Sequence, residues 1–192
     1  MTRLLLITML GSLLSACIPS SAIQPVTAMD SLGQDSILLV GKLVLDPPLK
    51  PEEQELGMYE EYRNTAILAT DTALREVGDH MAWGDLKRRI EVPFDETFML
   101  EVPREDFYIL KGWVMMDATK GNGSAPLHGQ FRIDVQDGDR AVYIGTLHYT
   151  RNTFFRITDV RVKDESRAAS SDVRVRLGSS VNLRKSLAQP LK

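Results

Sequence analysis

The segment that most constrains the fold is residues 37–45, because both of its faces are apolar. It reads Ile-Leu-Leu-Val-Gly-Lys-Leu-Val-Leu, and Asp46-Pro47-Pro48 follows it directly. The run is short for a helix and ends at the proline pair, which favours a β-strand. We therefore expect this strand at the centre of a sheet.

The rest of the chain supplies further short apolar runs separated by turn residues. Runs with strand character occupy residues 64–70, 88–92, 97–102, 107–116, 131–135, 141–149 and 155–162, and Val173, Val175 and Leu177 form a last alternating strand. Short helices are predicted at residues 164–171 and 180–187, and one helical turn after Pro51. About eight strands with one or two short helices favour a mainly β fold, an antiparallel β-sandwich.

Three local patterns make this prediction specific. Asp137-Gly138-Asp139 joins two alternating runs and predicts a hairpin over residues 131–149, with Ile133 inside and His148 on the face of Val142. Lys120 to Pro126 reads as a loop by composition. Ile157 and Val160 have opposite parity, which predicts a β-bulge near Thr158 and Asp159.

The amino terminus has the form of a secretory signal. Arg3 precedes an apolar run of about ten residues, half of what a membrane-spanning helix needs. Small residues, Ser15 and Ala16, then lead to Cys17, the single cysteine of the chain. An ordinary cleaved signal with an incidental cysteine is the alternative.

The motif Leu14-Ser15-Ala16-Cys17 resembles the lipobox of bacterial lipoproteins. The resemblance implies a signal peptide at residues 1–16, a lipidated Cys17 with a flexible tether to residue 35, and a β-sandwich domain at residues 36–192. It further implies palmitate on Cys17, attachment to the lipid bilayer and a place in the bacterial cell envelope. Ile18 after the cysteine favours attachment to the outer membrane over the inner membrane, with the periplasm as the expected compartment.

The predicted hairpin over residues 131–149 is also similar to strands of small bacterial lipoproteins with transthyretin-like or immunoglobulin-like sandwiches. Its central Tyr143-Ile144-Gly145 carries that similarity. Many of those proteins are uncharacterised, so the resemblance supports the fold and assigns no functional residue.

Charge and cysteine content narrow the function classes. The sequence has 23 basic and 26 acidic residues, and loss of Arg3 with the leader leaves 22 against 26, a net charge of −4. This composition lacks the basic excess of nucleic-acid-binding proteins. With Cys17 committed to lipid, no intramolecular disulfide can form.

No motif predicts catalysis, a metal or a cofactor. His80, His128 and His148 are far apart in sequence, and no nucleophile elbow, phosphate-binding loop or dinucleotide fingerprint is present. We therefore expect a protein that is not an enzyme. Two alternatives stay open: a composite site of His128, His148 and an aspartate, and a pair of carboxylates such as Asp71 with Asp79.

The best candidates for binding are aromatic side chains in long loops. The acidic excursion at residues 52–62 carries Tyr59 and Tyr62, although a solvated loop is the simpler interpretation of it. Trp83 and Trp113 are better explained as core or rim aromatics, and the alternative is a small-ligand or glycan binder that uses them. We expect a membrane-anchored interaction or assembly domain with an envelope protein as partner; a glycan binder and an envelope hydrolase are the alternatives.

Overall fold

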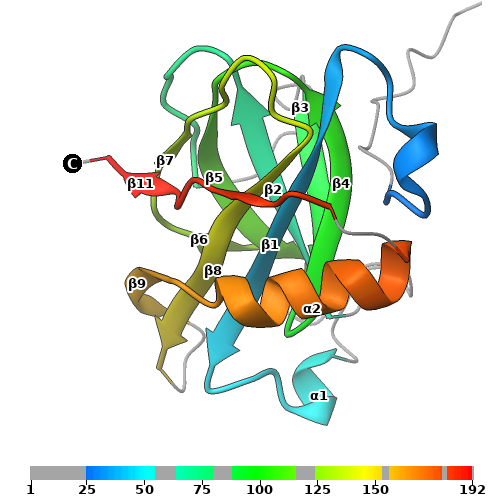
Figure 1. Cartoon of the computed structure of the whole chain (residues 1–192). Coiled ribbons are helices and arrows are strands. Elements are labelled where there is room, and N and C mark those ends of the chain that lie inside the picture. Colours follow the sequence, from blue (N-terminus) through cyan, green and yellow to red (C-terminus); the bar gives the residue numbers. More distant parts are fainter. Residues whose placement is uncertain are drawn as a thin grey trace, which may run out of the picture.

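The computed structural model describes residues 25–54, 64–79, 88–115, 124–152, 156–178 and 181–191, and places them in two packed β-sheets (Figure 1). The prediction of a β-sandwich with few helices is confirmed. The strands are β1 (Ser36–Asp46), β2 (Thr65–Asp71), β3 (Arg88–Pro93), β4 (Thr97–Pro103), β5 (Phe107–Met115), β6 (Ser124–Leu127), β7 (Phe131–Ile133), β8 (Ala141–Arg151), β9 (Ile157–Lys163), β10 (Arg184–Lys185) and β11 (Gln189–Pro190). The helical elements are η1 (Met29–Ser31), α1 (Pro51–Gln54) and α2 (Ser166–Leu177).

Strands of the two sheets alternate irregularly along the sequence. Sheet B has the order β10-β8-β1-β4, and β9 also pairs with β8. Sheet A has the order β11-β7-β5-β2-β3, and β6 also pairs with β5. As predicted, β1 lies inside its sheet, antiparallel to β4, but it runs parallel to β8. The sandwich is therefore mixed at this pair.

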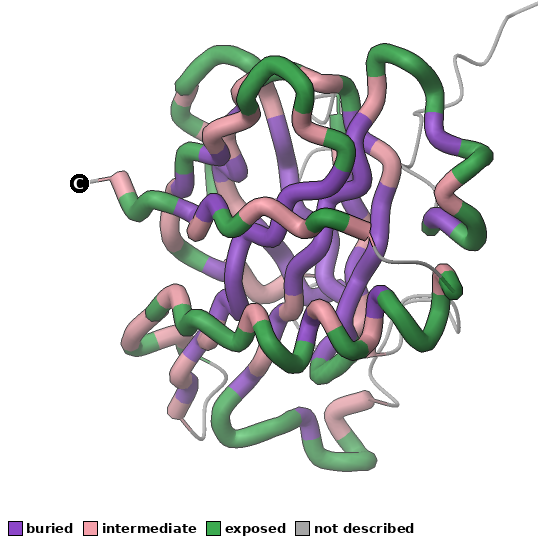
Figure 2. The backbone as a smooth tube through the Cα atoms, in the orientation of Figure 1, coloured by how far each residue is buried: buried purple, intermediate pink, exposed green. Residues whose placement is uncertain are grey.

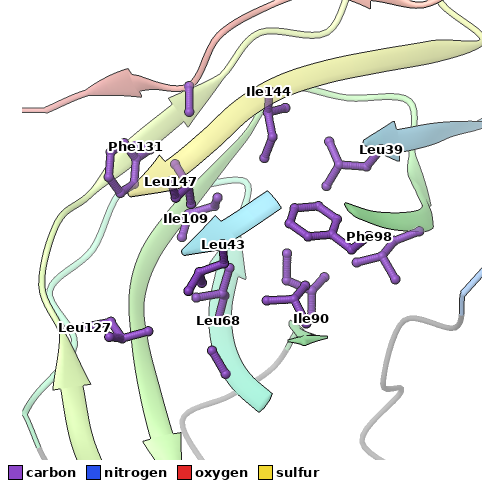
Figure 3. Packing of buried hydrophobic residues seen from close by; sticks show 14 of the residues in the cluster. Leu39, Leu43, Leu68, Ile90, Phe98, Ile109, Leu127, Phe131, Ile144 and Leu147 are labelled. Atoms are coloured by element: carbon purple, nitrogen blue, oxygen red, sulfur yellow. The ribbon is translucent and has the colours of Figure 1, made fainter. Parts of the chain in front are cut away.

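The core lies between the sheets, and buried segments of β1 and β8 run through the middle of the molecule (Figure 2). The inward side chains interdigitate across the two layers (Figure 3). They include Leu39, Leu43, Leu68, Ile90, Phe98, Ile109, Leu127, Phe131, Ile144 and Leu147. Ile133 is fully buried among them, as its alternation with Arg132 predicts.

The predicted hairpin over residues 131–149 is wrong. β7 pairs with β5 and β11 in sheet A, whereas β8 belongs to sheet B. Asp137 and Gly138 therefore form an arch from one sheet to the other. Turn composition predicts a reversal of the chain, and a reversal is equally compatible with strands that pair and with strands that pack face to face.

Residues 173–177, predicted as a strand, form the second half of α2. Ala169 and Val173 are four residues apart, lie on one face of the helix and are buried. Val175 points the other way and is 80% exposed. Figure 1 shows α2 lying across the outside of sheet B, where its apolar side covers that face.

Residues 25–35, assigned above to the tether, pack on the same outer face. Val26 and Leu32 are buried in the same cluster as Val173, and the Val26 amide donates to Met99 O at 2.8 Å. The domain therefore begins no later than Pro25, and the residues between Cys17 and Pro25 lie outside the described part. A few apolar residues spaced among polar ones are enough for a segment that covers the outer surface of a sheet and builds no core of its own.

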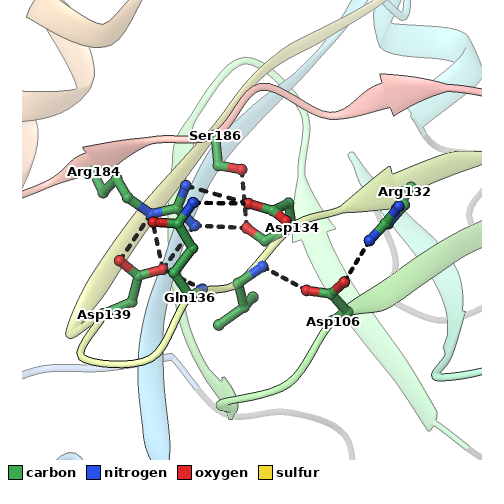
Figure 4. Close-up of polar contacts among 8 residues, drawn as sticks. Asp106, Arg132, Asp134, Gln136, Asp139, Arg184 and Ser186 are labelled. Carbon is green, nitrogen blue, oxygen red and sulfur yellow. Dashed lines mark hydrogen bonds and ion pairs between the residues drawn. The ribbon is translucent and has the colours of Figure 1, made fainter.

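The predicted helix at residues 180–187 is also wrong, because its described part belongs to a strap at residues 181–191 that joins the sheets. β10 adds to β8 in sheet B and β11 adds to β7 in sheet A. Arg184 holds the strap to the arch: its guanidinium donates to both oxygens of Asp139 and to Asp134 O (Figure 4). Ser186 donates to the same Asp134 carbonyl at 2.9 Å.

Two bulges set which faces the last strands present. The predicted bulge at Thr158 is confirmed, since Thr150 pairs with Asp159 and the next residue, Arg151, pairs with Ile157. A second bulge at Gly145 was not predicted; its φ is +97°, and Ile144 and Gly145 together oppose one residue of β1. Because the bulge shifts the parity, Leu147 and Tyr149 join Val142 and Ile144 inside. His148 is therefore not on the face of Val142.

The Gly145 bulge generates a test of this packing. Replacing Gly145 with Ala adds a Cβ that would lie 2.7 Å from Val162 Cγ1, at a backbone conformation that disfavours side chains. The matched control is Gly138→Ala, where φ is +87° and no atom lies within 4 Å of the new Cβ. We expect Gly145→Ala to lower the free energy of unfolding by about 1–3 kcal/mol more than the control does. Equal losses in urea titrations would contradict the bulge.

Candidate interaction site at the α1 end of the sandwich

The described start of the acidic excursion is fixed to the sandwich by one buried arginine. Arg151, the last residue of β8, is 5% exposed. Its Nη1 and Nη2 donate to the two carboxylate oxygens of Glu53 in α1, each at 2.7 Å. Its Nε and Nη2 also donate to the carbonyls of Pro47 and Pro48 at 2.7 Å. Such a two-pronged pair holds α1 in one orientation.

The same contacts set the charge of this site. The hydrogen bonds from Arg151 lower the pKa of Glu53, although burial opposes them, so the carboxylate stays ionised. The Lys50 amide also donates to Glu53 Oε2 at 2.7 Å. Glu52 on the same turn is exposed. α1 is therefore held firmly on the sandwich, and the sequence that follows it carries Glu55, Glu60 and Glu61.

Several predicted site residues lie outside the described part of the chain: Cys17, Tyr59, Tyr62, His80 and Trp83. Trp113 is described, and it is a core residue; the alternative that it offers a binding surface is wrong. Its side chain is fully buried on the outer side of sheet A with Ile67 and Leu110, and Nε1 donates to Asp79 O at 2.8 Å. Its hydrogen bond and its contacts are those of a core aromatic.

The structure does not bring the described histidines together. His128 Nδ1 lies 4.0 Å from Asp79 Oδ1, which also accepts a hydrogen bond from Lys111 at 2.7 Å. His148 Nε2 lies 3.9 Å from Asp46 Oδ2. The described residues contain no group of three metal-ligating side chains. Their helices include none that is long and apolar enough to cross a bilayer.

The suggested carboxylate pair is separately engaged. Asp71 accepts a hydrogen bond from Arg75 Nε at 2.8 Å, and this contact lowers the pKa of Asp71. Asp79 contacts Lys111. Each carboxylate thus has its own basic neighbour, and a shared proton between the two finds no support in these contacts.

A polar cavity of about 50 Å³ lies under α2, between the helix and sheet B. Thr146 Oγ1 donates to Glu165 Oε2 at 2.7 Å, and Thr97 Oγ1 donates to Asp172. Burial raises the pKa of Tyr143, whose hydroxyl accepts a hydrogen bond from the Glu165 amide. Lys42 lines the cavity and makes no ion pair with a described residue. The space suits a few ordered waters, and the carboxylates are already hydrogen-bonded.

Sequence reasoning missed both Arg151 and Lys42. Lys42 had a signal, because it is the single charged residue in the apolar run at residues 37–45. Arg151 had none, since its partners lie 98 to 104 residues away in the chain. Comparison of the chain with family models, curated proteins and solved structures finds no match.

The Arg151–Glu53 pair makes stability depend on pH in a predictable direction. The folded pKa of Glu53 is lowered, so its contribution is present above the ordinary value of 4.5 and is lost as pH falls below it. Wild-type protein should therefore lose more stability than Glu53→Gln on acidification from neutral pH. At neutral pH, Arg151→Met should lower the free energy of unfolding by about 3–5 kcal/mol because it leaves Glu53 unpaired.

Urea titrations across the pH range measure both effects. The matched control is Arg132→Met, which breaks an exposed pair with Asp106 and should cost less than about 1 kcal/mol. Parallel pH profiles of unfolding free energy for wild type and Glu53→Gln would contradict a stabilising Arg151–Glu53 pair.

Proposed function

We propose that this chain is a bacterial envelope lipoprotein, held in the outer membrane by acylated Cys17, whose sandwich acts as a non-catalytic interaction or assembly domain. The observation that carries the proposal is the buried Arg151–Glu53 pair. The pair joins a buried arginine to a half-buried glutamate and fixes α1 to the sandwich. Partner-binding segments are typically positioned by a rigid scaffold of this kind.

The place of α1 supports this reading. Pro25 forms a bridge with Leu100, which pairs with Leu39 of β1. The end of β1, at Asp46, is seven residues beyond Leu39 (46 minus 39), or about 23 Å along the strand. The end of β1 that leads to α1 is thus well away from the point where the anchored segment joins the domain.

The chemistry of the excursion indicates the kind of partner. Its acidic side chains would steer a basic protein surface toward it. Tyr59 and Tyr62 are large amphipathic side chains with few rotatable bonds, which makes them good anchors at a protein interface. The partner we propose is therefore an envelope protein with a basic, partly apolar surface.

The anchor is tested by metabolic labelling with palmitate. The parent chain should incorporate label, and Cys17→Ser should not, because a thioether to diacylglycerol forms only on sulfur. Leader processing should fail in the same variant. Label on the Ser variant, or none on the parent, would refute the lipoprotein assignment.

The interaction surface is tested by changing Tyr59 and Tyr62 to Ser together. We expect a nearly unchanged melting temperature and a clear loss of the partner recovered by crosslinking and pull-down from envelopes. The control is Leu74→Ser, which removes a side chain that is 53% exposed elsewhere on the surface. Unchanged recovery at normal stability would reject the loop as the binding surface, and an early melt would show that the tyrosines belong to the core.

A further inference from the structure

The outward face of α2 combines basic side chains with an exposed apolar one. Arg167, Arg174 and Val175 are spaced by seven and eight residues, so they lie on one side of the helix. All three are exposed, and Val175 is 80% exposed. Ala169 and Val173 lie on the opposite side, against sheet B.

These arginines are not explained by the fold alone. Arg167 and Arg174 form no ion pair with a described residue, and Asp172 is turned inward to Thr97. Basic residues at the end of a helix favour its dipole, which accounts for Arg174. The helix dipole disfavours a basic residue in the first turn, where Arg167 lies. It also does not explain why an apolar residue, Val175, is exposed to solvent. The face is therefore basic in excess of what the helix needs.

This helix lies close to the anchored end of the chain. Pro25, Val26 and Arg176 line one groove, and Val26 packs in the same cluster as Val173. In Figure 1, α2 crosses sheet B, and its C-terminal end is on the side of the blue segment that begins at Pro25. Cys17 precedes Pro25 by eight residues, which span at most about 28 Å when fully extended.

A lipid on Cys17 would therefore keep α2 within reach of the bilayer surface. Arginine side chains bind phosphate oxygens in two-pronged geometry, and clusters of basic residues beside a membrane anchor are attracted to anionic lipids. Glu96, in the groove beside Arg176, is one opposing charge, and Glu91 there is paired with Arg89 at 2.9 Å.

We propose that the outer face of α2 lies against the anionic headgroups of the bilayer that holds Cys17. The proposal rests on the lipid anchor of the proposed function. In this arrangement sheet B faces the membrane through α2, with Arg167 and Arg174 on lipid phosphates and Val175 at the boundary of the acyl region. Sheet A and the α1 end stay open to a protein partner.

The test uses the full lipidated chain in vesicles of phosphatidylcholine, with or without phosphatidylglycerol. Because Cys17 is blocked by lipid, Ser171→Cys on the outward face of α2 gives one site for a fluorophore. A spin label on the lipid headgroups should quench it strongly in the anionic vesicles and weakly in the neutral ones. A fluorophore at Leu74→Cys, after β2 of sheet A, should be quenched weakly in both.

Charge variants then test the face itself. Each arginine near an anionic surface contributes about fivefold to binding, so Arg167→Gln with Arg174→Gln should reduce docking on the order of 20-fold. The matched control is Arg88→Gln with Arg132→Gln, which removes the same charge from exposed positions in sheet A and should leave quenching unchanged. Added salt should mimic the first pair, because it screens exposed charges.

Flotation of the vesicles distinguishes failure of the lipid anchor from failure of the α2 docking face. A chain that does not float with either vesicle has no lipid anchor, and the proposed function fails. A chain that floats while Ser171→Cys is quenched equally in neutral and anionic vesicles keeps its anchor and overturns the docking face. Full quenching in the double arginine variant overturns it as well, because α2 would then lie at the headgroups without the charges proposed to hold it there.

Discussion

The two-sided burial of β1 is the constraint on which the rest of the structure depends. Leu39 and Leu43 face the core between the sheets, and Leu38 and Val40 face outward. All four are fully buried. Since burying a side chain of this size contributes about 1.5–3 kcal/mol, an uncovered outer face would be costly. The chain therefore needs a third layer outside sheet B.

That layer comes from three segments that have little core of their own. α2, residues 25–35 and the first part of the strap, residues 181–187, pack on the outer cluster of sheet B, and their apolar side chains are sparse. Polar contacts give them their positions: Arg184 fixes the strap to Asp139, and Thr97 fixes α2 through Asp172. Hydrogen bonds to charged groups supply the specificity that few apolar contacts cannot.

The sheet layers were predictable because alternation is a local signal. Patterns among neighbouring residues predict the central place of β1 and the bulge at Thr158. They also predict where β2, β4 and β5 begin and end. The third layer was not predictable in the same way. Val173 and Leu177 are four residues apart, a spacing that fits one face of a helix and one face of a strand, and only the environment of Val175 separates the two.

The candidate site was predictable to an even smaller extent. The acidic composition drew attention to the excursion, and the helical turn after Pro51 is confirmed. The contact that holds α1 in place joins Glu53 to Arg151, which are separated by about half of the sequence. No pattern among neighbouring residues predicts such a contact. Trp113 is an aromatic residue of the kind that binds ligands, yet its position in β5 places it in a buried cluster with Ile67 and Leu110 on the outer side of sheet A.

The most direct test of the covering layer compares Val173→Asp with Val175→Asp. In α2, Val173 is buried against sheet B and Val175 is in solvent, so the first variant should lose about 3 kcal/mol or more of unfolding free energy and the second less than about 0.5. Were residues 173–177 a strand, both valines would lie on one face. Similar losses for the two variants in urea titrations would contradict the account.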